Sequence, residues 1–114
     1  MGIVLTQGVG KMITRHWTGL AKCEEAGNYV RHLQEATLPE LSRIEGFISA
    51  QILRREADRG VEFLIVTNWE SIEAIKKFAG EAAEVAVVPD VVQAMMIQYD
   101  LKARHYEVAA SYAD

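Results

Sequence analysis

The chain has 114 residues, half of them hydrophobic and a quarter charged, and its formal net charge is −4 at pH 7. This length suits one domain with one hydrophobic core, and the composition is that of a folded protein and not of a disordered chain. The negative charge and the absence of a basic stripe argue against a nucleic-acid partner, and no apolar run approaches the ~20 residues that a membrane span needs.

The cysteine and histidine content argues against a bound metal. A single cysteine, Cys23, excludes an intrachain disulfide and a cysteine-based metal site. The histidines, His16, His32 and His105, fall in three separate predicted elements and lack the spacing of a metal site. The N-terminus, Met1–Lys11, lacks the basic region and long apolar core of a signal peptide. We therefore expect a cytoplasmic protein with no metal and no membrane contact.

The first core strand is predicted over Met12–Leu20. Side chains alternate between the two faces of a strand, so Ile13, Arg15 and Trp17 share one face. The preceding segment, residues 1–11, is interpreted as an N-terminal arm or an extra edge strand outside the core fold.

A long helix is predicted from Cys23 to about Leu38, because apolar residues that include Tyr29 recur at helical spacing. Gly27 lowers the helix propensity of this segment, so we expect it to permit close packing. Pro39 is expected to end this helix and to begin a short one, Pro39–Ile44.

Two strands, Phe47–Glu56 and Val61–Trp69, are predicted on either side of a hairpin loop, Ala57–Gly60. The second strand contains the run Phe63–Val66, which is apolar on both faces. Such a run is typical of a central strand that is covered on both sides.

The C-terminal half is expected to add one helix and one strand. Ser71 can cap a helix over Ile72–Ala79, on which Glu73 and Lys77 have the spacing of an ion pair. A long last strand is predicted from Met95 to Val108, followed by a peripheral tail, residues 109–114.

The order strand, helix, strand, strand, helix, strand predicts an α+β fold, the ferredoxin-like split βαβ with a four-stranded antiparallel sheet. The domain spans residues 12–108. The helices cover one face of such a sheet, which leaves Leu64 and Val66, and some of Met96, Gln98 and Asp100, on the other. A large uncovered apolar face usually marks a partner surface, so we expect a homodimer that packs sheet against sheet.

Several short motifs follow one another along the domain. They are Arg15-x-Trp17-x-Gly19, Leu38-Pro39, Gly46-Phe47, Trp69-Glu70-Ser71, Phe78-Ala79-Gly80 and His105-Tyr106-Glu107-Val108. In this order and spacing they resemble the antibiotic biosynthesis monooxygenase (ABM) superfamily of dimeric α+β barrels. The resemblance covers about Met12 to Val108.

The resemblance implies a barrel between two subunits and a pocket between helices and sheet in each. Some members of the superfamily oxidise polyketide-type aromatic compounds with O₂ and without metal or flavin. It therefore implies a cofactor-independent monooxygenase that acts on a small aromatic, polyketide- or quinol-like substrate and binds no cofactor. An electron-rich phenolate can itself reduce O₂, so the protein needs only to deprotonate, position and desolvate it.

Strand parity and the resemblance together give the candidate site. The candidate substrate-binding residues, which would form an aromatic and apolar wall, are Trp17, Tyr29, Phe63, Ile65 and Trp69. Arg15 and His105 are the candidate catalytic residues. A buried guanidinium binds an anion or a carbonyl, and a histidine can serve as a base near neutral pH.

Each candidate also has a structural interpretation. Both tryptophans are more often core aromatics that hold a helix on a sheet. Arg15 can pair with Glu70 or Glu107, and His105 can hold a structural hydrogen bond. A cavity of ~300 Å³ or more beside Arg15 and the tryptophans favours an enzyme, whereas solid packing of that space disfavours one.

Two departures from the superfamily leave other functions open. Haem degraders carry a histidine on the helix after the third strand, and Ser71–Gly80 has none. The monooxygenase subgroup has an asparagine where this chain has Ile65. The alternative is a non-catalytic dimeric protein of the same fold that binds a small molecule or serves in stress, with haem binding or degradation as a minor option.

Overall fold

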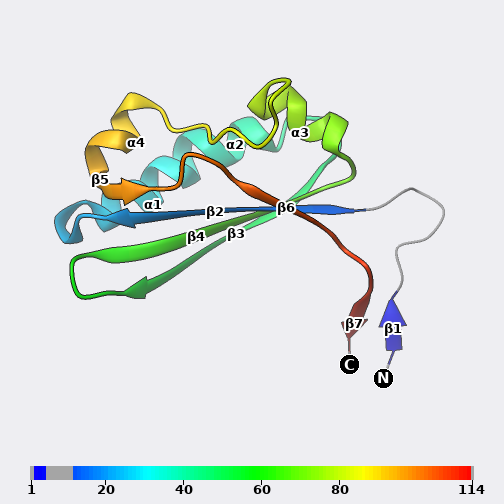
Figure 1. Ribbon diagram of the computed structural model, residues 1–114, viewed down its shortest axis with the longest axis horizontal. Helices are drawn as coiled ribbons and strands as arrows, with labels where there is room; N and C mark the ends of the chain where they lie inside the picture. Colours follow the sequence, from blue (N-terminus) through cyan, green and yellow to red (C-terminus); the bar gives the residue numbers. More distant parts are fainter. Residues whose placement is uncertain (1, 5–11, 114) are drawn as a thin grey trace.

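In the computed structural model, which describes residues 2–4 and 12–113, one antiparallel sheet carries helices on a single face (Figure 1). The sheet strands are β2 (Ile13–Ala21), β3 (Phe47–Glu56), β4 (Val61–Trp69), β5 (Met96–Tyr99) and β6 (Arg104–Glu107). Their order is β3-β4-β2, and both β5 and β6 pair with the free side of β2. This arrangement confirms the predicted α+β, ferredoxin-like fold.

The pairing of β2 with β4 places the candidate site residues on one face of the sheet. Arg15 lies opposite Thr67, and Trp17 lies opposite Ile65. Because directly opposed residues of antiparallel strands point to the same side, these four side chains share the helix-covered face. The predicted bounds of β3 and β4 and the hairpin between them are confirmed.

The first helical run continues through Pro39, so the prediction that Pro39 ends the helix is wrong. It consists of η1 (Cys23–Glu25), α1 (Ala26–His32), the π-helical turn η2 (Leu33–Thr37) and α2 (Leu38–Leu41). In an α-helix a proline ring strikes the carbonyl four residues earlier. The wider π turn, in which Leu38 N–H donates to the Leu33 carbonyl, ends at Thr37, two residues before Pro39, and makes room for its ring.

Gly27 does not serve close packing, contrary to expectation. It is exposed, and a Cβ there would meet nothing within 4 Å. Replacing Gly27 with alanine is therefore expected to raise the free energy of unfolding by about 0.5–1 kcal/mol, through better helix propensity and a less flexible unfolded chain. Urea unfolding followed by circular dichroism measures the change.

Gly19→Ala is the matched control for this substitution, because a Cβ at Gly19 would lie 2.6 Å from a ring carbon of Trp17. It should lower the free energy of unfolding. If Gly27→Ala destabilised the protein as well, the helix would be packed against something at that position.

The predicted last strand is interrupted. Asp100 N–H donates to the Thr18 carbonyl, and after it the chain leaves the sheet to form an isolated bridge between Lys102 and Val85. It returns as β6, which pairs with the other end of β2. The prediction of one continuous strand is therefore wrong. Met96, at the start of β5, is 6% exposed and belongs to the core, so it does not contribute to the uncovered face.

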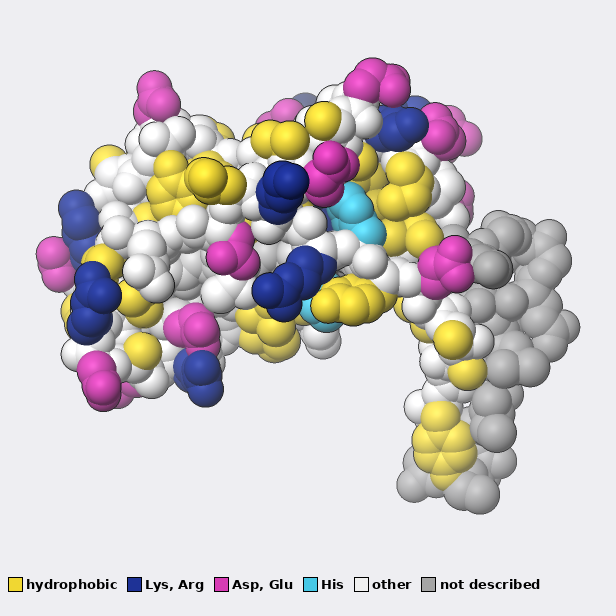
Figure 2. Space-filling view, viewed as in Figure 1, with side chains coloured by type: hydrophobic (Ala, Val, Ile, Leu, Met, Phe, Trp, Pro, Cys, Tyr) yellow, Lys and Arg dark blue, Asp and Glu magenta, His cyan; other side chains and the backbone are white. Residues whose placement is uncertain are grey.

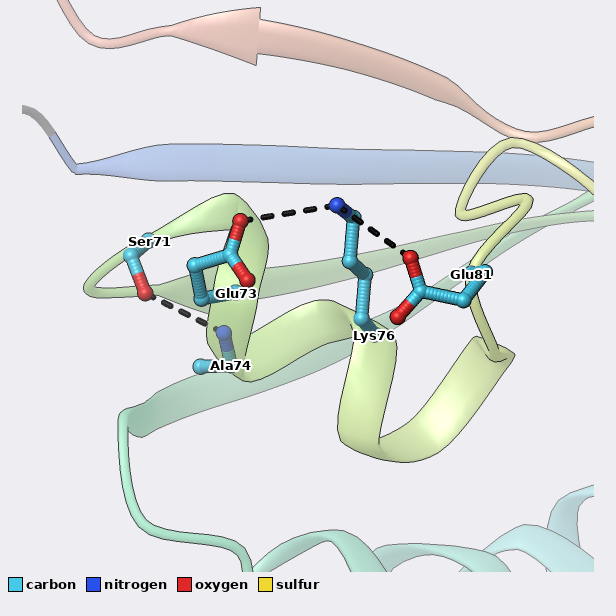
Figure 3. A network of polar contacts seen from close by, with 5 residues as sticks. All are labelled: Ser71, Glu73, Ala74, Lys76 and Glu81. Atoms are coloured by element: carbon cyan, nitrogen blue, oxygen red, sulfur yellow. Dashed lines mark hydrogen bonds and ion pairs between the residues drawn. The ribbon is translucent and has the colours of Figure 1, made fainter.

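The α3 helix (Ile72–Ala79) has its predicted bounds and cap. The Ser71 hydroxyl oxygen accepts a hydrogen bond from Ala74 N–H at 3.1 Å (Figure 3). Glu73 pairs with Lys76 at 3.5 Å, not with Lys77 as predicted, and Lys76 also reaches Glu81 at 3.7 Å. Such exposed ion pairs contribute little to stability.

The two ends of the chain form a small ribbon of their own. β1 (Gly2–Val4) pairs antiparallel with β7 (Ser111–Ala113), and the ribbon extends away from the main sheet in Figure 1. Residues 1 and 5–11 lie outside the described part of the chain. Of the segment 1–11, which was interpreted as an arm or an extra strand, the structure therefore describes only β1.

The second face of the sheet carries no helix in the part of the chain that the structure describes. β4 is central, as predicted, but no described helix lies on the side away from α1 and α3 (Figure 1). Leu64 and Val66 are half-buried there, and Leu53 on the adjoining β3 is 44% exposed. None of the described helices is long and apolar enough to cross a membrane.

Candidate functional site

An apolar cavity lies between the sheet and the helical layer. The sheet contributes Arg15, Trp17, Ile65 and Thr67, and the other lining residues are Tyr29, Leu33, Thr37, Leu38, Leu41, Phe78, Val87, Pro89 and Val92. The mouth is marked by Val87, which is 44% exposed. It belongs to the segment before α4 (Asp90–Met95), a region where apolar side chains gather on the surface in Figure 2.

The cavity is smaller than expected for an enzyme of two- or three-ring substrates. Its volume is about 70 Å³, and all the space between atoms in and around it, open solvent included, amounts to about 620 Å³. A volume of about 70 Å³ accepts a few water molecules or the head group of a ligand, and the body of that ligand has to extend towards solvent. Tyr29, Leu33 and Phe78 narrow the interior.

Arg15 is held in this wall by neutral partners. Its side chain is 5% exposed; Nη1 donates to the Ala83 carbonyl and Nη2 donates to the Val85 carbonyl at 3.2 Å. Its guanidinium also lies 5.7 Å from the centre of the Phe78 ring. Burial lowers the pKa of Arg15, opposed by the charge of Glu84, yet an arginine stays protonated at neutral pH. These contacts include no glutamate, so the alternative in which Arg15 pairs with Glu70 or Glu107 is wrong.

His105 lies beside Arg15 on the neighbouring strand. The register of β2 with β6 sets the two residues opposite each other, and Nη1 of Arg15 is 2.8 Å from Nε2 of His105. A guanidinium only donates, so Nε2 accepts and the ring carries its proton on Nδ1. His105 does not line the cavity, and its contact with Arg15 identifies it as a residue that positions the guanidinium.

The pKa of His105 gives a test of this contact. Burial lowers it from the ordinary value of 6.5, the charge of Arg15 lowers it further, and Glu84 opposes both. Below pH 6.5, His105 therefore takes up a proton in the unfolded chain, whereas in the folded protein it stays neutral until the pH falls to its lower folded-state pKa. The contribution of neutral His105 to stability is complete above pH 6.5 and declines as the pH falls below it.

His105→Gln should remove this dependence, since the amide oxygen of glutamine can accept from Arg15 at every pH. We expect the wild-type protein to lose more stability than the variant between about pH 7.5 and about pH 5.5, measured by urea unfolding at each pH. Equal losses in the two proteins would show that Nε2 does not accept from Arg15.

The structure brings together part of the predicted site. Trp17, Tyr29 and Ile65 line the cavity with Arg15. The Trp17 ring lies 6.4 Å from the Tyr29 ring, and its Nε1 donates to the Asp100 carbonyl at 2.8 Å. Tyr29 is 2% exposed, and burial raises the pKa of its hydroxyl, which therefore stays protonated at neutral pH.

Phe63 and Trp69, expected as pocket walls, lie instead in the core and do not line the cavity. Both are fully buried. Phe63 lies behind Tyr29, with ring centres 4.9 Å apart. Trp69 is enclosed between Phe47 and Phe78, with ring centres at 5.3 and 6.3 Å. They have the predicted facing, but other aromatic side chains stand between them and the cavity.

Sequence reasoning did not include Thr67, Thr37 and Val87 among the cavity residues. Thr67 shares the parity of Arg15 and Ile65, which was a usable signal. Thr37 lies on the same predicted helical stripe as Tyr29 and Leu33, which was a usable signal as well. Val87 reaches the cavity from a segment with no periodic pattern, so it had no clear signal. In the part of the chain that the structure describes, no three His, Cys, Asp or Glu residues gather as a metal site.

Comparisons with known proteins agree with this architecture. Residues 12–88, more than half of the 114-residue chain, match the family model described as antibiotic biosynthesis monooxygenase. No curated protein matches the chain.

Solved structures share the fold at low identity. The chain is 24% identical to a candidate antibiotic biosynthesis monooxygenase from Bacillus cereus, with a TM-score of 0.66 over 92% of this chain and 98% of that one. A protein from Shewanella oneidensis is 14% identical, with a TM-score of 0.67 over 97% of this chain and 100% of that one. A haem degrader from Mycobacterium tuberculosis, with two haems in its active site, is 21% identical, with a TM-score of 0.56 over 89% of this chain and 99% of that one. Because the family model covers most of the domain, the chain belongs to the antibiotic biosynthesis monooxygenase family.

Proposed function

We propose that this protein is a cofactor-independent oxygenase that oxidises a small phenolic or quinol-like compound in the Arg15 cavity. The observation that carries the proposal is a buried guanidinium in the wall of an otherwise apolar and aromatic cavity. The family to which the chain belongs supports it. The cavity volume of about 70 Å³ favours a single-ring substrate, held by its head group, over a multi-ring polyketide.

The reaction needs no external reductant. A phenol reacts with one O₂ to give a para-quinone and one water: one oxygen atom becomes the new carbonyl opposite the hydroxyl, and the other leaves as water with the ring hydrogen and the hydroxyl hydrogen. The substrate supplies all four electrons.

The side chains around the cavity have distinct roles in this reaction. Arg15 favours the phenolate over the phenol, because an opposite charge nearby stabilises the ionised form, and the phenolate is the form that reduces O₂. Trp17, Ile65 and Phe78 exclude water from the phenolate oxygen. The phenol proton leaves through the mouth. His105 acts through Arg15 and touches neither the substrate nor O₂.

Oxygen uptake with single-ring phenols tests the proposal. With ¹⁸O₂, we expect uptake in a one-to-one ratio with quinone, and one labelled oxygen in each quinone, above the rate measured without protein. No uptake above that rate across a series of phenols and quinols would contradict the proposal.

The second candidate is a non-catalytic protein that binds the same kind of molecule. It is favoured by one observation, that no side chain suited to act as a base at neutral pH lines the cavity. A phenol that binds without oxygen uptake would identify this function. Haem binding is not proposed, because a haem greatly exceeds the enclosed volume and no histidine is among the lining residues.

We also propose a homodimer that packs the uncovered sheet faces together. Leu64→Lys should give a particle of 12.7 kDa, where the wild-type protein at micromolar concentration gives twice that mass. Sedimentation velocity measures both. Leu101→Lys, at a residue that is 74% exposed and lies between β5 and β6 outside the sheet strands, is the control and should stay dimeric. A wild-type monomer would contradict the proposal.

A further inference from the structure

The cavity contains a positive charge with no counter-charge in contact. The guanidinium of Arg15 bonds to two carbonyl groups and to a neutral ring nitrogen of His105, and it forms no ion pair with any described residue. Glu84 acts on it electrostatically from an exposed position. A buried charge is costly unless it is paired, so the site is completed by an anion.

The guanidinium also has free donors. The three contacts use both N–H groups of Nη1 and one of Nη2, which leaves Nε–H and the second Nη2–H without a partner among the described residues. No buried side-chain nitrogen or oxygen in that part of the chain lacks a partner, so Nε, which has none there, touches accessible space. Nε and Nη2 are neighbours on one planar edge, the arrangement that binds two oxygens of one group.

Two hydroxyl groups add to these donors. Tyr29 is 2% exposed and lines the cavity, and its hydroxyl has no hydrogen-bond partner in the described part of the chain. Thr67 accepts a hydrogen bond from Trp69 Nε1 at 2.9 Å, which leaves its own O–H to donate. No carboxylate lines the cavity. The polar groups of the site thus present hydrogen-bond donors and one positive charge.

We propose that the ligand of this cavity is a small planar monoanion in which two coplanar oxygens share one negative charge, bound on the Nε–Nη2 edge of Arg15. An aromatic carboxylate and a ring with two adjacent oxygens, as in tropolonate, share this chemistry. The oxygen pair fits the cavity volume of about 70 Å³, and the ring lies towards solvent. This inference goes beyond the proposed function, because it names an anion that the same cavity binds whether or not a phenol is oxidised there.

Calorimetric titration of the wild-type protein tests the inference without any variant. Benzoate and tropolonate are each compared with benzamide, which is neutral and has nearly the shape of benzoate. We expect at least one of the two anions to bind at least 10-fold more tightly than benzamide, and the tighter of the two identifies the source of the oxygen pair. If benzamide binds as tightly as either anion, or if neither anion binds at millimolar concentration, the inference is overturned.

Variants of Arg15 and Tyr29 then show which side chains cause the preference for the anion over benzamide. In Arg15→Met the preference for the anion over benzamide should vanish, and in Arg15→Lys, which keeps the charge and loses the fork, it should persist at reduced strength. Tyr29→Phe should weaken anion binding by several-fold. A preference that survives unchanged in Arg15→Met also overturns the inference, provided that the variant's circular dichroism spectrum shows it to be folded.

Oxygen uptake in the same samples separates the two proposals. If the anions bind selectively and no aromatic compound is oxidised, the inference stands and the oxygenase function fails. If neutral phenols are oxidised while no anion is preferred, the function stands and the inference fails.

Discussion

Arg15→Met is expected to lower kcat/KM for phenol oxidation by about 100- to 1,000-fold, the range seen when one donor to a developing oxyanion is removed. Methionine fills a similar volume but cannot stabilise a phenolate, so the substrate stays in its neutral form and transfers electrons to O₂ slowly. Oxygen uptake against phenol concentration, measured with an oxygen electrode, gives the ratio.

The matched control is Arg104→Met, which removes an exposed arginine one residue before His105 on β6. It should leave kcat/KM unchanged. A loss of equal size in both variants would mean that the overall charge of the protein, and not the cavity, governs the rate.

Trp69→Ala is expected to lower the free energy of unfolding by about 3–5 kcal/mol, as for large aromatic residues in a core. Trp69 is fully buried, its ring packs against Phe47 and Phe78, and its Nε1 donates to Thr67. Truncation leaves a cavity and an unfilled hydrogen bond. Since small domains are stable by only about 5–15 kcal/mol, this one change consumes much of the total.

Trp17→Ala is the comparison for that experiment. Trp17 is only half-buried and lines the cavity, so its truncation should cost less stability and should weaken the binding of aromatic ligands. Urea unfolding and calorimetric titration of both variants measure the two effects. A larger stability loss for Trp17→Ala would reverse the assignment of one tryptophan to the core and the other to the cavity.

The segment Trp69-Glu70-Ser71 shows how far the sequence predicts the fold. The strand end at Trp69, the cap at Ser71 and the bounds of α3 were all predictable from local chemistry, since alternation and N-capping act within a few residues. Parity also assigned Trp69 to the helix-covered face. It could not show how deep the side chain lies, because that depends on Phe47 and Phe78, which come from other elements.

The Arg15–His105 contact shows which part of the candidate site the sequence could not predict. Both residues were predicted as candidates, but their contact depends on the register between β2 and β6, which a single sequence does not reveal. The last strand is also interrupted for a non-local reason, the bridge between Lys102 and Val85. The π turn before Pro39 likewise depends on how the helix packs over the cavity, which propensity alone does not express.

Both proposals require the free edge of Arg15 to bind the oxygen of the ligand. Nuclear magnetic resonance of the arginine Nε–H signals, recorded during titration with a single-ring phenol or benzoate, tests this contact. The Arg15 signal should shift and saturate with the same Kd as calorimetry, while the signal of exposed Arg104 stays in place. An unchanged Arg15 signal at saturating ligand would contradict the claim.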